Sequence, residues 1–211
     1  MPDNSLASTG PGRPKDLAKR QAILDAAKNL FLRNGYASTS MDAVATEAGV
    51  SKLTVYSHFT DKETLFSAAV VARCEEQLPD LFFEVAHDTP VEVVLNNIGR
   101  GFYALINSPE SLELHRLMVA QGAQEPKLAQ IFFEAGPQRI QQEMERFLSE
   151  IDKSGCLRIE SPRIATEHFL SLLKGVCNFQ LLIGCAEQPS EQEAQEHVQE
   201  VVSFFMRAYR P

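Results

Sequence analysis

Helix start signals recur along this chain, and they constrain its fold more than any other feature. Ser108-Pro109 and Ser161-Pro162 each pair a good N-cap residue with a proline that suits the first helical turn. Capping boxes, in which a Glu follows the cap by three residues, occur at Thr60–Glu63, Thr89–Glu92 and Ser190–Glu193. Apolar residues between these signals repeat at helical spacing, and the alternation typical of strands is nearly absent. The sequence therefore predicts an all-α fold of about nine or ten helices.

Breaks in the apolar pattern predict where individual helices end. The first helix is expected over Lys15–Arg33, because Asn34-Gly35 supplies a left-handed stop. The helix that opens at Thr60 is expected to continue into the eighties, with a bend at Pro79. Gly136-Pro137 is expected to divide a later segment into two helices, or to bend one.

Gly99–Ala104 has the GxGxxA spacing of a dinucleotide-binding turn. That turn requires a strand before it and further strands that build a parallel sheet. Here the apolar residues from Val91 to Ile106 keep a helical phase through both glycines, and no second strand follows. We therefore interpret the segment as the interior of a helix.

Charge is distributed unevenly along the chain. The formal net charge is −8, yet residues 1–65 hold 8 Lys and Arg against 7 Asp and Glu. A local basic segment can bind phosphates while the rest of a protein stays acidic. The distribution favours an approach to DNA through the N-terminal part of the chain.

Several classes of protein are disfavoured by what the sequence lacks. The longest stretch without Asp, Glu, Lys or Arg, Gly175–Ala186, is too short to span a bilayer, and Met1–Gly12 lacks the apolar centre of a signal peptide. The 4 cysteines form no CxxC pair, and no GxSxG, HExxH or P-loop motif occurs. We expect a cytoplasmic protein without a membrane partner, catalytic residues, bound metal or cofactor.

Two short helices between Ser40 and Phe59 form the strongest candidate site. Gly49 makes a turn between them, and Ser51 caps the second, which is the pattern of a helix-turn-helix. The second helix carries short polar and cationic side chains, which suit the base edges and phosphates of a major groove. On spacing alone, the same pair also occurs as ordinary packing in all-α domains.

The residues around this motif agree with one family at many fixed offsets. The segment contains Ala22-Ile-Leu-Asp-Ala-Ala-Lys-Asn-Leu-Phe-Leu-Arg-Asn-Gly-Tyr36, Thr39-Ser-Met-Asp-Ala-Val-Ala45, Ala48-Gly-Val-Ser51, Thr54-Val-Tyr-Ser-His-Phe59 and Lys62-Glu-Thr-Leu65. Over about residues 20–66 it resembles the DNA-binding domain of the TetR (tetracycline-repressor-like) family of transcriptional regulators. The rest of the chain resembles that family only loosely.

The resemblance implies which side chains contact DNA. The implied contacts are Thr54, Tyr56 and Lys62 to phosphates, and Lys52, Leu53, Ser57 and His58 at or near base edges. We expect the ring of Tyr56 to pack inside and its hydroxyl to face outward. Leu53 departs from the family, in which Gly is common at this position, and a leucine suits contact with a thymine methyl group.

Residues on either side of these contacts complete the implied interface. Thr39 and Ser40 are expected to cap the second helix, where either hydroxyl reaches a phosphate. Arg13, in an extended segment beside Pro14, resembles a hook for the minor groove. The alternative for Arg13 is an unstructured basic tail.

The resemblance also implies three regions: a basic-ended arm over 1–14, a DNA-binding domain over 15–62, and a regulatory domain over 63–211. Ten of the 13 phenylalanines lie beyond residue 66, and a cavity between bundle helices is a common ligand site. The candidate ligand contacts are Phe82, Phe102, His115, Met118, Phe133, Phe169 and Gln180. The segment from Ile164 to Cys185 is apolar nearly all round, which indicates more than one buried face. The candidate dimer contacts are Phe169, Leu173, Val176, Val198, Val202 and Phe205.

Two functions of different classes follow. The first is a ligand-responsive repressor that binds a palindromic DNA operator as a homodimer and is released by a small apolar or amphipathic effector. The second is a helical small-molecule-binding protein or enzyme in which the helix-turn-helix is only packing. Binding to the DNA upstream of its own gene separates them.

Overall fold

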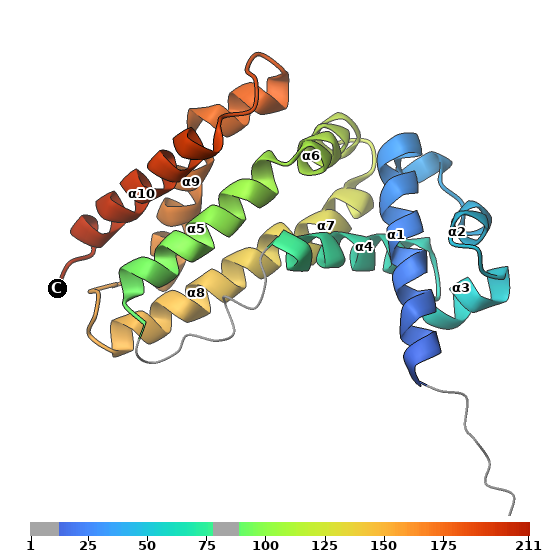
Figure 1. Ribbon diagram of the computed structural model, residues 1–211, viewed down its shortest axis with the longest axis horizontal. Helices are drawn as coiled ribbons and strands as arrows, with labels where there is room; N and C mark the ends of the chain where they lie inside the picture. Colours follow the sequence, from blue (N-terminus) through green and yellow to red (C-terminus); the bar gives the residue numbers. More distant parts are fainter. Residues whose placement is uncertain (1–12, 78–88) are drawn as a thin grey trace, which may run out of the picture. The chain divides into compact units, whose positions relative to one another are not determined.

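The computed structural model describes residues 13–77 and 89–211, and within those ranges it contains ten α-helices and no strand (Figure 1). The predicted all-α fold is confirmed. The chain forms two compact units, which follow one another in sequence at Ala69 and Val70. This division lies inside a helix, seven residues beyond the domain boundary that the sequence suggests.

The first unit contains α1 (Arg13–Ser38), α2 (Met41–Glu47), α3 (Lys52–His58) and the beginning of α4 (Lys62–Gln77). α1 loses helical geometry at Gly35, where φ is 76° and ψ is 167°. Glycine adopts this conformation without steric cost, so the expected stop occurs where the sequence places it. The helix begins at Arg13, two residues earlier than predicted, so Arg13 is not in an extended arm. Residues 1–12 of that arm lie outside the described residues.

Aromatic side chains join the end of α1 to the beginning of α4 within the first unit. The ring of Phe66 lies 5.2 Å from the rings of both Phe31 and Tyr36, in edge-to-face geometry. Edge-to-face pairs place the positive edge of one ring on the negative face of the other. Val44 and Val55 are fully buried beside them and anchor α2 and α3 to this core.

The N-cap of α4 differs from the prediction by one residue. Asp61 Oδ1 accepts a hydrogen bond from the backbone N–H of Thr64 at 2.7 Å, so Asp61 and not Thr60 caps the helix. This backbone hydrogen bond lowers the pKa of the Asp61 carboxyl, because it favours the charged form. α4 is described as far as Gln77, and the predicted bend at Pro79 lies outside the described residues.

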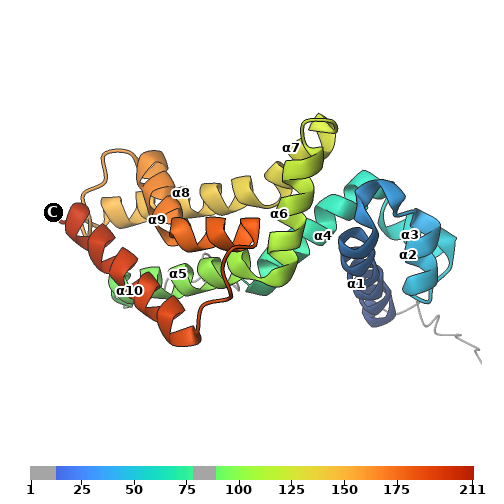
Figure 2. The same ribbon diagram turned by 90° about the horizontal axis from the view of Figure 1, so that it is seen from above.

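The second unit is a helical bundle. Its helices are the end of α4, α5 (Val91–Asn107), α6 (Pro109–Gln121), α7 (Pro126–Ala135), α8 (Pro137–Lys153), α9 (Pro162–Ile183) and α10 (Glu191–Ala208). α5 packs against α10 and α9, and α8 packs against α9 and α7 (Figures 1 and 2). The core lies among α5, α8, α9 and α10, with Phe169 and Phe205 fully buried at an edge-to-face distance of 5.0 Å.

The predicted helix starts in this unit are largely confirmed. Ser108, Ser161 and Ser190 each accept a hydrogen bond from a backbone N–H of the first turn, and the capping box at Ser190 is complete. Gly136 separates α7 from α8, as expected. The prediction of a capping box at Thr89 is wrong: Pro90 is the N-cap of α5, and no side chain caps it.

Gly99 lies in the interior of α5, which confirms the helical interpretation of the GxGxxA segment. A Cβ atom at this position would stand 2.8 Å from Val198 Cγ1 and 3.4 Å from Leu173 Cδ2. The first distance is shorter than van der Waals contact. The glycine therefore lets α5 lie close to α10.

Replacing Gly99 by alanine is expected to destabilise the second unit by about 1–3 kcal/mol, although alanine is the better helix former. The added methyl group must displace a β-branched side chain in a closely packed core. Denaturant unfolding measures the effect. Arg100→Ala, at an exposed position on the same helix, serves as the control and should change stability by less than about 0.5 kcal/mol. Equal stability of Gly99→Ala and the wild type would show that the packing of α5 against Val198 has room for a methyl group.

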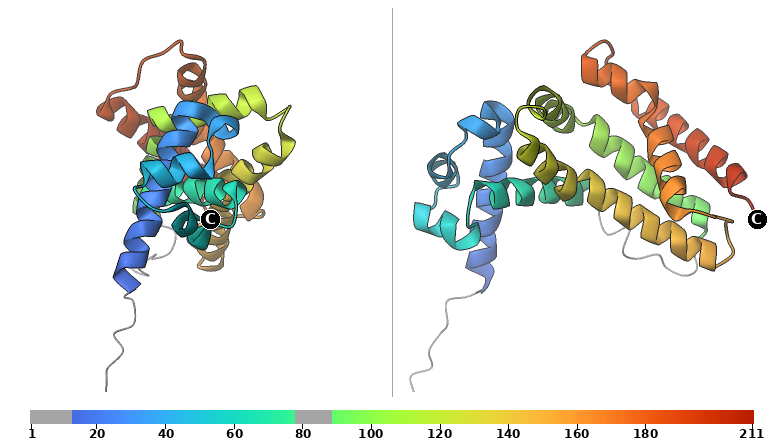
Figure 3. Two further views of the ribbon diagram at one scale, coloured as in Figure 1. Left: turned by 90° about the vertical axis from the view of Figure 1, so that its right-hand side faces the viewer. Right: turned by 180° about the vertical axis from the view of Figure 1, so that it is seen from behind.

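α9 is divided by a kink at Gly175, where φ is 55° and ψ is −167° (Figures 2 and 3). The ring of His197 from α10 lies against this point, and its Nε2 is 3.0 Å from the backbone oxygen of Leu173. At the other end, Arg116 of α6 donates to the carbonyls of Leu181 and Leu182 at 2.7 and 2.8 Å. Side chains from two neighbouring helices thus fix the direction of the second half of α9.

Candidate DNA-binding surface and ligand cavity

The helix-turn-helix is formed by α2 and α3, which pack together in the first unit (Figure 1). Ser40 and Ser51 cap the two helices, and each hydroxyl accepts a hydrogen bond at 3.1 Å from a backbone N–H of the first turn. Gly49, with φ 65°, makes the turn between them. A left-handed conformation strains other residues, which explains the glycine.

One face of α3 is free of the core. Leu53 is 80% exposed, and Lys52 and Ser57 are also exposed. Tyr56 is 42% exposed and lies beside the Lys52 ammonium, 6.0 Å from the ring centre. The expectation that the Tyr56 ring packs inside is therefore wrong, because Val55 and Phe59 fill the core side of this short helix.

Several of these side chains already have partners on their own surface. Lys52 forms an exposed ion pair with Asp42 of α2 at 2.7 Å, and this hydrogen bond raises the pKa of the lysine. The hydroxyls of Thr54 and Ser51 are 2.8 Å apart, and Ser57 Oγ donates to the Thr54 carbonyl at 2.7 Å. Exposed contacts of this kind contribute little to stability, so they exchange readily for contacts to a ligand.

Thr39 has a structural role that the sequence did not reveal. It is only 2% exposed, and its hydroxyl lies 3.1 Å from the Leu30 carbonyl and 2.8 Å from that of Gly35. The expectation that Thr39 shares the capping of α2 is wrong, since Ser40 alone performs it. A buried hydroxyl that binds the end of α1 is also poorly placed to reach a phosphate.

Lys62 likewise fastens parts of the first unit to one another. Its ammonium donates to the carbonyls of Tyr36, Ala37 and Thr39 at 2.7, 3.2 and 2.9 Å, and it lies 4.3 Å from the Tyr36 ring centre. An ammonium has three hydrogens, so three carbonyls use all of them. The geometry therefore gives Lys62 a structural role in place of the predicted phosphate contact.

A cavity of about 150 Å³ lies in the second unit, among α4, α5, α6, α8, α9 and Phe132 of α7. Its wall is mainly apolar, with Val70, Phe102, Leu105, Ile106, Ile140 and Leu170 among the lining residues. Of the predicted ligand contacts, Phe102 and His115 line this cavity. Phe169 belongs to the core beside it, and Phe133, Met118 and Gln180 are not in its wall. Phe82 lies outside the described residues.

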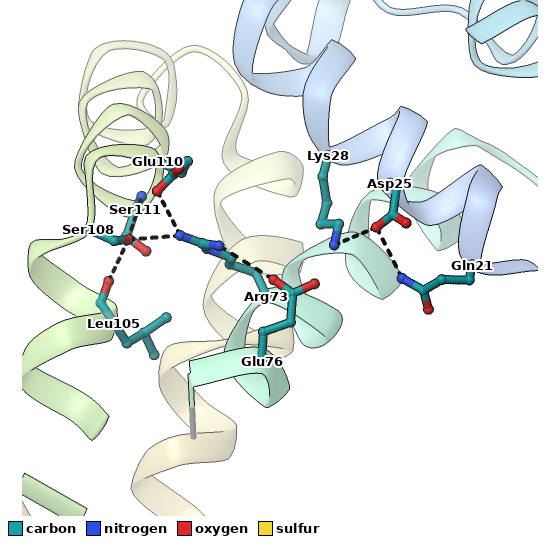
Figure 4. Close-up of polar contacts among 9 residues, drawn as sticks. All are labelled: Gln21, Asp25, Lys28, Arg73, Glu76, Leu105, Ser108, Glu110 and Ser111. Atoms are coloured by element: carbon teal, nitrogen blue, oxygen red, sulfur yellow. Dashed lines mark hydrogen bonds and ion pairs between the residues drawn. The ribbon is translucent and has the colours of Figure 1, made fainter. Parts of the chain in front are cut away.

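The polar groups of the wall include Arg73, Ser111 and His115. Arg73 of α4 donates to Glu110 at 2.7 Å and to the Ser108 hydroxyl at 3.2 Å, and Glu76 stands 3.4 Å away (Figure 4). Burial raises the pKa of the Cys74 thiol in the same wall to about 11. This thiol is therefore protonated at neutral pH and unreactive.

The predicted dimer contacts are mostly interior residues. Five of the six are buried in the core of a single chain and are therefore not on the surface that a second copy could contact: Phe169, Leu173, Val198, Val202 and Phe205. Helical spacing alone does not tell which apolar side of a helix faces its own bundle. Val176 is the sixth, and it is 72% exposed.

Val176 belongs to an exposed apolar stripe whose other members were not predicted from the sequence. The stripe consists of Leu172, Val176, Phe179, Ile183 and, on α10, Phe204, all of which are exposed. Beyond the kink at Gly175, the intervals of three and four residues from Val176 to Ile183 place these members on one side of the second half of α9. Contiguous exposed apolar residues mark interaction surfaces.

An all-α chain with an N-terminal helix-turn-helix and a helical bundle around a cavity has the architecture of a DNA-binding transcriptional regulator. The model of the bacterial regulatory proteins of the tetR family matches residues 23–69, and that of the AefR-like transcriptional repressor C-terminal domain matches residues 93–211. The second match covers more than half of the chain. The protein belongs to the TetR family of transcriptional regulators.

Individual relatives agree with this assignment. The HTH-type transcriptional regulators SrpR and TtgW of Pseudomonas putida are each 29% identical over 136 residues, or 63% of this chain. The match covers 90% of TtgW but only 57% of SrpR, so the chain spans little more than half the length of SrpR.

Two solved structures resemble nearly the whole chain. A TetR-family regulator from Mesorhizobium loti is 28% identical with a TM-score of 0.77, covering 94% of this chain and 99% of that one. The flavonoid-responsive regulator FrrA is 30% identical with a TM-score of 0.71, covering 92% and 97%. Within the described residues, no helix combines the length and the apolar character that a membrane span requires.

Proposed function

We propose that the protein is a repressor that binds a palindromic operator as a homodimer and is released from it by a small molecule. The observation that carries the proposal is the exposed face of α3, which is the second helix of the helix-turn-helix in the first unit of a TetR-family chain. The bundle of the second unit holds the cavity that a ligand-controlled repressor needs.

DNA would be read by the exposed residues of α3. Leu53 and Ser57, which are exposed, would meet base edges, and the Tyr56 hydroxyl and Thr54 would meet phosphates. Lys52 carries the positive charge of this face, and its exposed pair with Asp42 can give way to a phosphate. Half-buried His58 stands at the end of the helix and has a smaller part in the interface.

Dimerisation would bury the exposed stripe of α9 and α10 against the same stripe of a second copy. In a dimer with two-fold symmetry, the same patch of each subunit contacts that patch of the other, so one apolar stripe can form both sides of the interface. A dimer would set the two α3 helices one helical turn of DNA apart, about 34–36 Å, which is the reason for a palindromic operator.

The effector would act through α4. Val70, Arg73 and Cys74 in its second half line the cavity, and Lys62 at its first residue binds the carbonyls that precede α2. A ligand that displaces the second half of the helix therefore displaces the support of the helix-turn-helix. The apolar wall indicates an apolar or amphipathic molecule. FrrA, a related regulator, is flavonoid-responsive, and we propose an aromatic effector here as well.

Replacing Leu53 by glutamate is expected to weaken binding to the DNA upstream of the protein's own gene by about a hundredfold or more. The substitution places a negative charge on the helix that would enter the groove, and each lost base contact costs about 1–3 kcal/mol. Thermal stability should not change, because the side chain is exposed. Fluorescence anisotropy with labelled DNA measures the affinity.

Val93→Glu is the matched control, since it adds the same charge at an exposed apolar position of α5. It should bind DNA about as tightly as the wild type. Equal binding by Leu53→Glu and the wild type would mean that α3 does not dock on DNA. A wild type that binds no DNA specifically would favour the helical carrier or enzyme over the repressor.

A further inference from the structure

The cavity in the second unit limits the size of a ligand. Its volume is about 150 Å³, and its wall is mainly apolar. A closed apolar cavity of roughly this volume holds one benzene ring. The cavity therefore suits a molecule with one six-membered ring and small substituents.

Two polar side chains lie one turn apart on α6 in the wall of this cavity. Ser111 is only 6% exposed, and within the described part of the chain its hydroxyl forms no hydrogen bond. His115 lies four residues later and forms an edge-to-face contact with Phe132, with ring centres 5.4 Å apart. Both side chains line the cavity, so their polar groups can hydrogen-bond to a ligand that occupies it.

The hydrogen-bonding roles of His115 follow from its contacts. Its Nδ1 lies 2.6 Å from the Ser111 backbone oxygen, which can only accept, so Nδ1 carries the hydrogen. Burial lowers the pKa of the imidazole and outweighs the hydrogen bond to the Ser111 backbone, which raises it, and the charge of Lys174 also lowers it. The ring is therefore neutral at neutral pH, and its Nε2 is a hydrogen-bond acceptor.

The charged groups in the wall face partners of opposite charge or solvent. The Arg73 guanidinium donates to Glu110 and Ser108 through Nη2 and pairs with Glu76, while its Nε is buried and has no hydrogen-bond partner among the described residues. Glu167 pairs with Arg163 at 2.5 Å, and Lys174 is exposed to solvent. A buried charge without a partner is costly, so the cavity favours a ligand without a net charge.

We propose that the cavity binds a neutral single-ring phenol, whose hydroxyl donates to His115 Nε2 and accepts from the Ser111 hydroxyl. A phenolic hydroxyl is a donor and an acceptor at once, which matches an acceptor and a donor one helical turn apart. The aromatic ring occupies the apolar part of the cavity. This inference rests on the proposed ligand-responsive function and names the chemical class of its effector.

Calorimetric titration of the full chain with three probes of similar size tests the proposal. The probes are 4-ethylphenol, its methyl ether 4-ethylanisole and the anion 4-ethylbenzoate. The phenol is expected to bind about tenfold more tightly than the ether, because the ether leaves Nε2 without a donor. The benzoate should also bind more weakly, since its charge lacks a buried partner.

Two variants test whether His115 causes the preference for the phenol over the ether. His115→Phe keeps a ring beside Phe132 but removes the acceptor, so the preference for phenol over ether should fall to about one. Cys74→Ala changes the same wall without removing a polar contact, so both affinities should shift alike and the ratio should remain. Each ratio is measured within one protein and is therefore insensitive to differences in stability.

The outcomes separate this inference from the proposed function. Equal binding of phenol and ether by the wild type, tighter binding of the benzoate, binding of none of the probes, or an unchanged ratio in His115→Phe would overturn the phenol assignment. Binding of 4-ethylphenol as expected, with no effect on DNA affinity, would support the assignment and contradict ligand control.

Discussion

Phe179→Asp is expected to convert a dimeric protein into a monomer at micromolar concentration. Phe179 is exposed in a single chain and lies at the centre of the apolar stripe on α9. In a two-fold dimer the substitution occurs twice, and a central aromatic contact contributes about 2 kcal/mol or more. The dissociation constant should therefore rise by about a thousandfold. Light scattering or sedimentation measures the molecular mass.

Val119→Asp is the control for this substitution. Val119 is an exposed apolar residue of α6 outside the stripe, so its replacement should leave the dimer intact. DNA binding should follow the oligomeric state, because a monomer engages only half of a palindrome. A wild type that is monomeric at micromolar concentration, or a Phe179→Asp variant that remains dimeric, would show that the stripe is not the dimer interface.

Lys62→Ala is expected to destabilise the first unit by about 3 kcal/mol. The substitution leaves three carbonyls without their donor, and a hydrogen bond to a charged group contributes about 1.5 kcal/mol or more. For a unit of this size the melting temperature should fall by more than about 10 °C. Hydrogen exchange of the α1–α3 amides and thermal unfolding report the loss.

Lys19→Ala removes an exposed lysine from α1 and should leave the stability nearly unchanged. The salt dependence of DNA binding distinguishes a structural Lys62 from a phosphate-binding one. A phosphate contact would reduce the slope of log affinity against log salt by about one unit for each half-site. A stable Lys62→Ala variant with that reduced slope would contradict the structural role.

The fold was largely predictable because local signals act over a few residues. Ser108, Ser161 and Ser190 cap helices as their neighbours in sequence indicate, and Gly35 ends the first helix where a left-handed residue is needed. A predicted helix start was wrong by one residue where two adjacent residues could both act as the N-cap. Asp61 caps α4 in place of Thr60, because a carboxylate also accepts well from a backbone N–H.

The surface roles were less predictable because they depend on packing between distant segments. α9 is apolar on two sides, and only the fold shows that Leu173 faces the core while Val176 faces solvent. The carbonyls that bind Lys62 come from residues more than twenty positions earlier, which no local pattern reveals. Ser111 and Arg73 likewise enter the cavity wall through the arrangement of the helices.

The affinity of the protein for the DNA upstream of its own gene, with and without a bound cavity ligand, is the most direct test of ligand-controlled repression. Ligands are first selected because they raise the melting temperature, beginning with 4-ethylphenol and continuing through apolar and amphipathic compounds. A saturating ligand is expected to lower the DNA affinity by about a hundredfold, which corresponds to about 2.7 kcal/mol of coupling. Ligands that stabilise the protein but leave DNA affinity unchanged, across a chemically broad set, would contradict it.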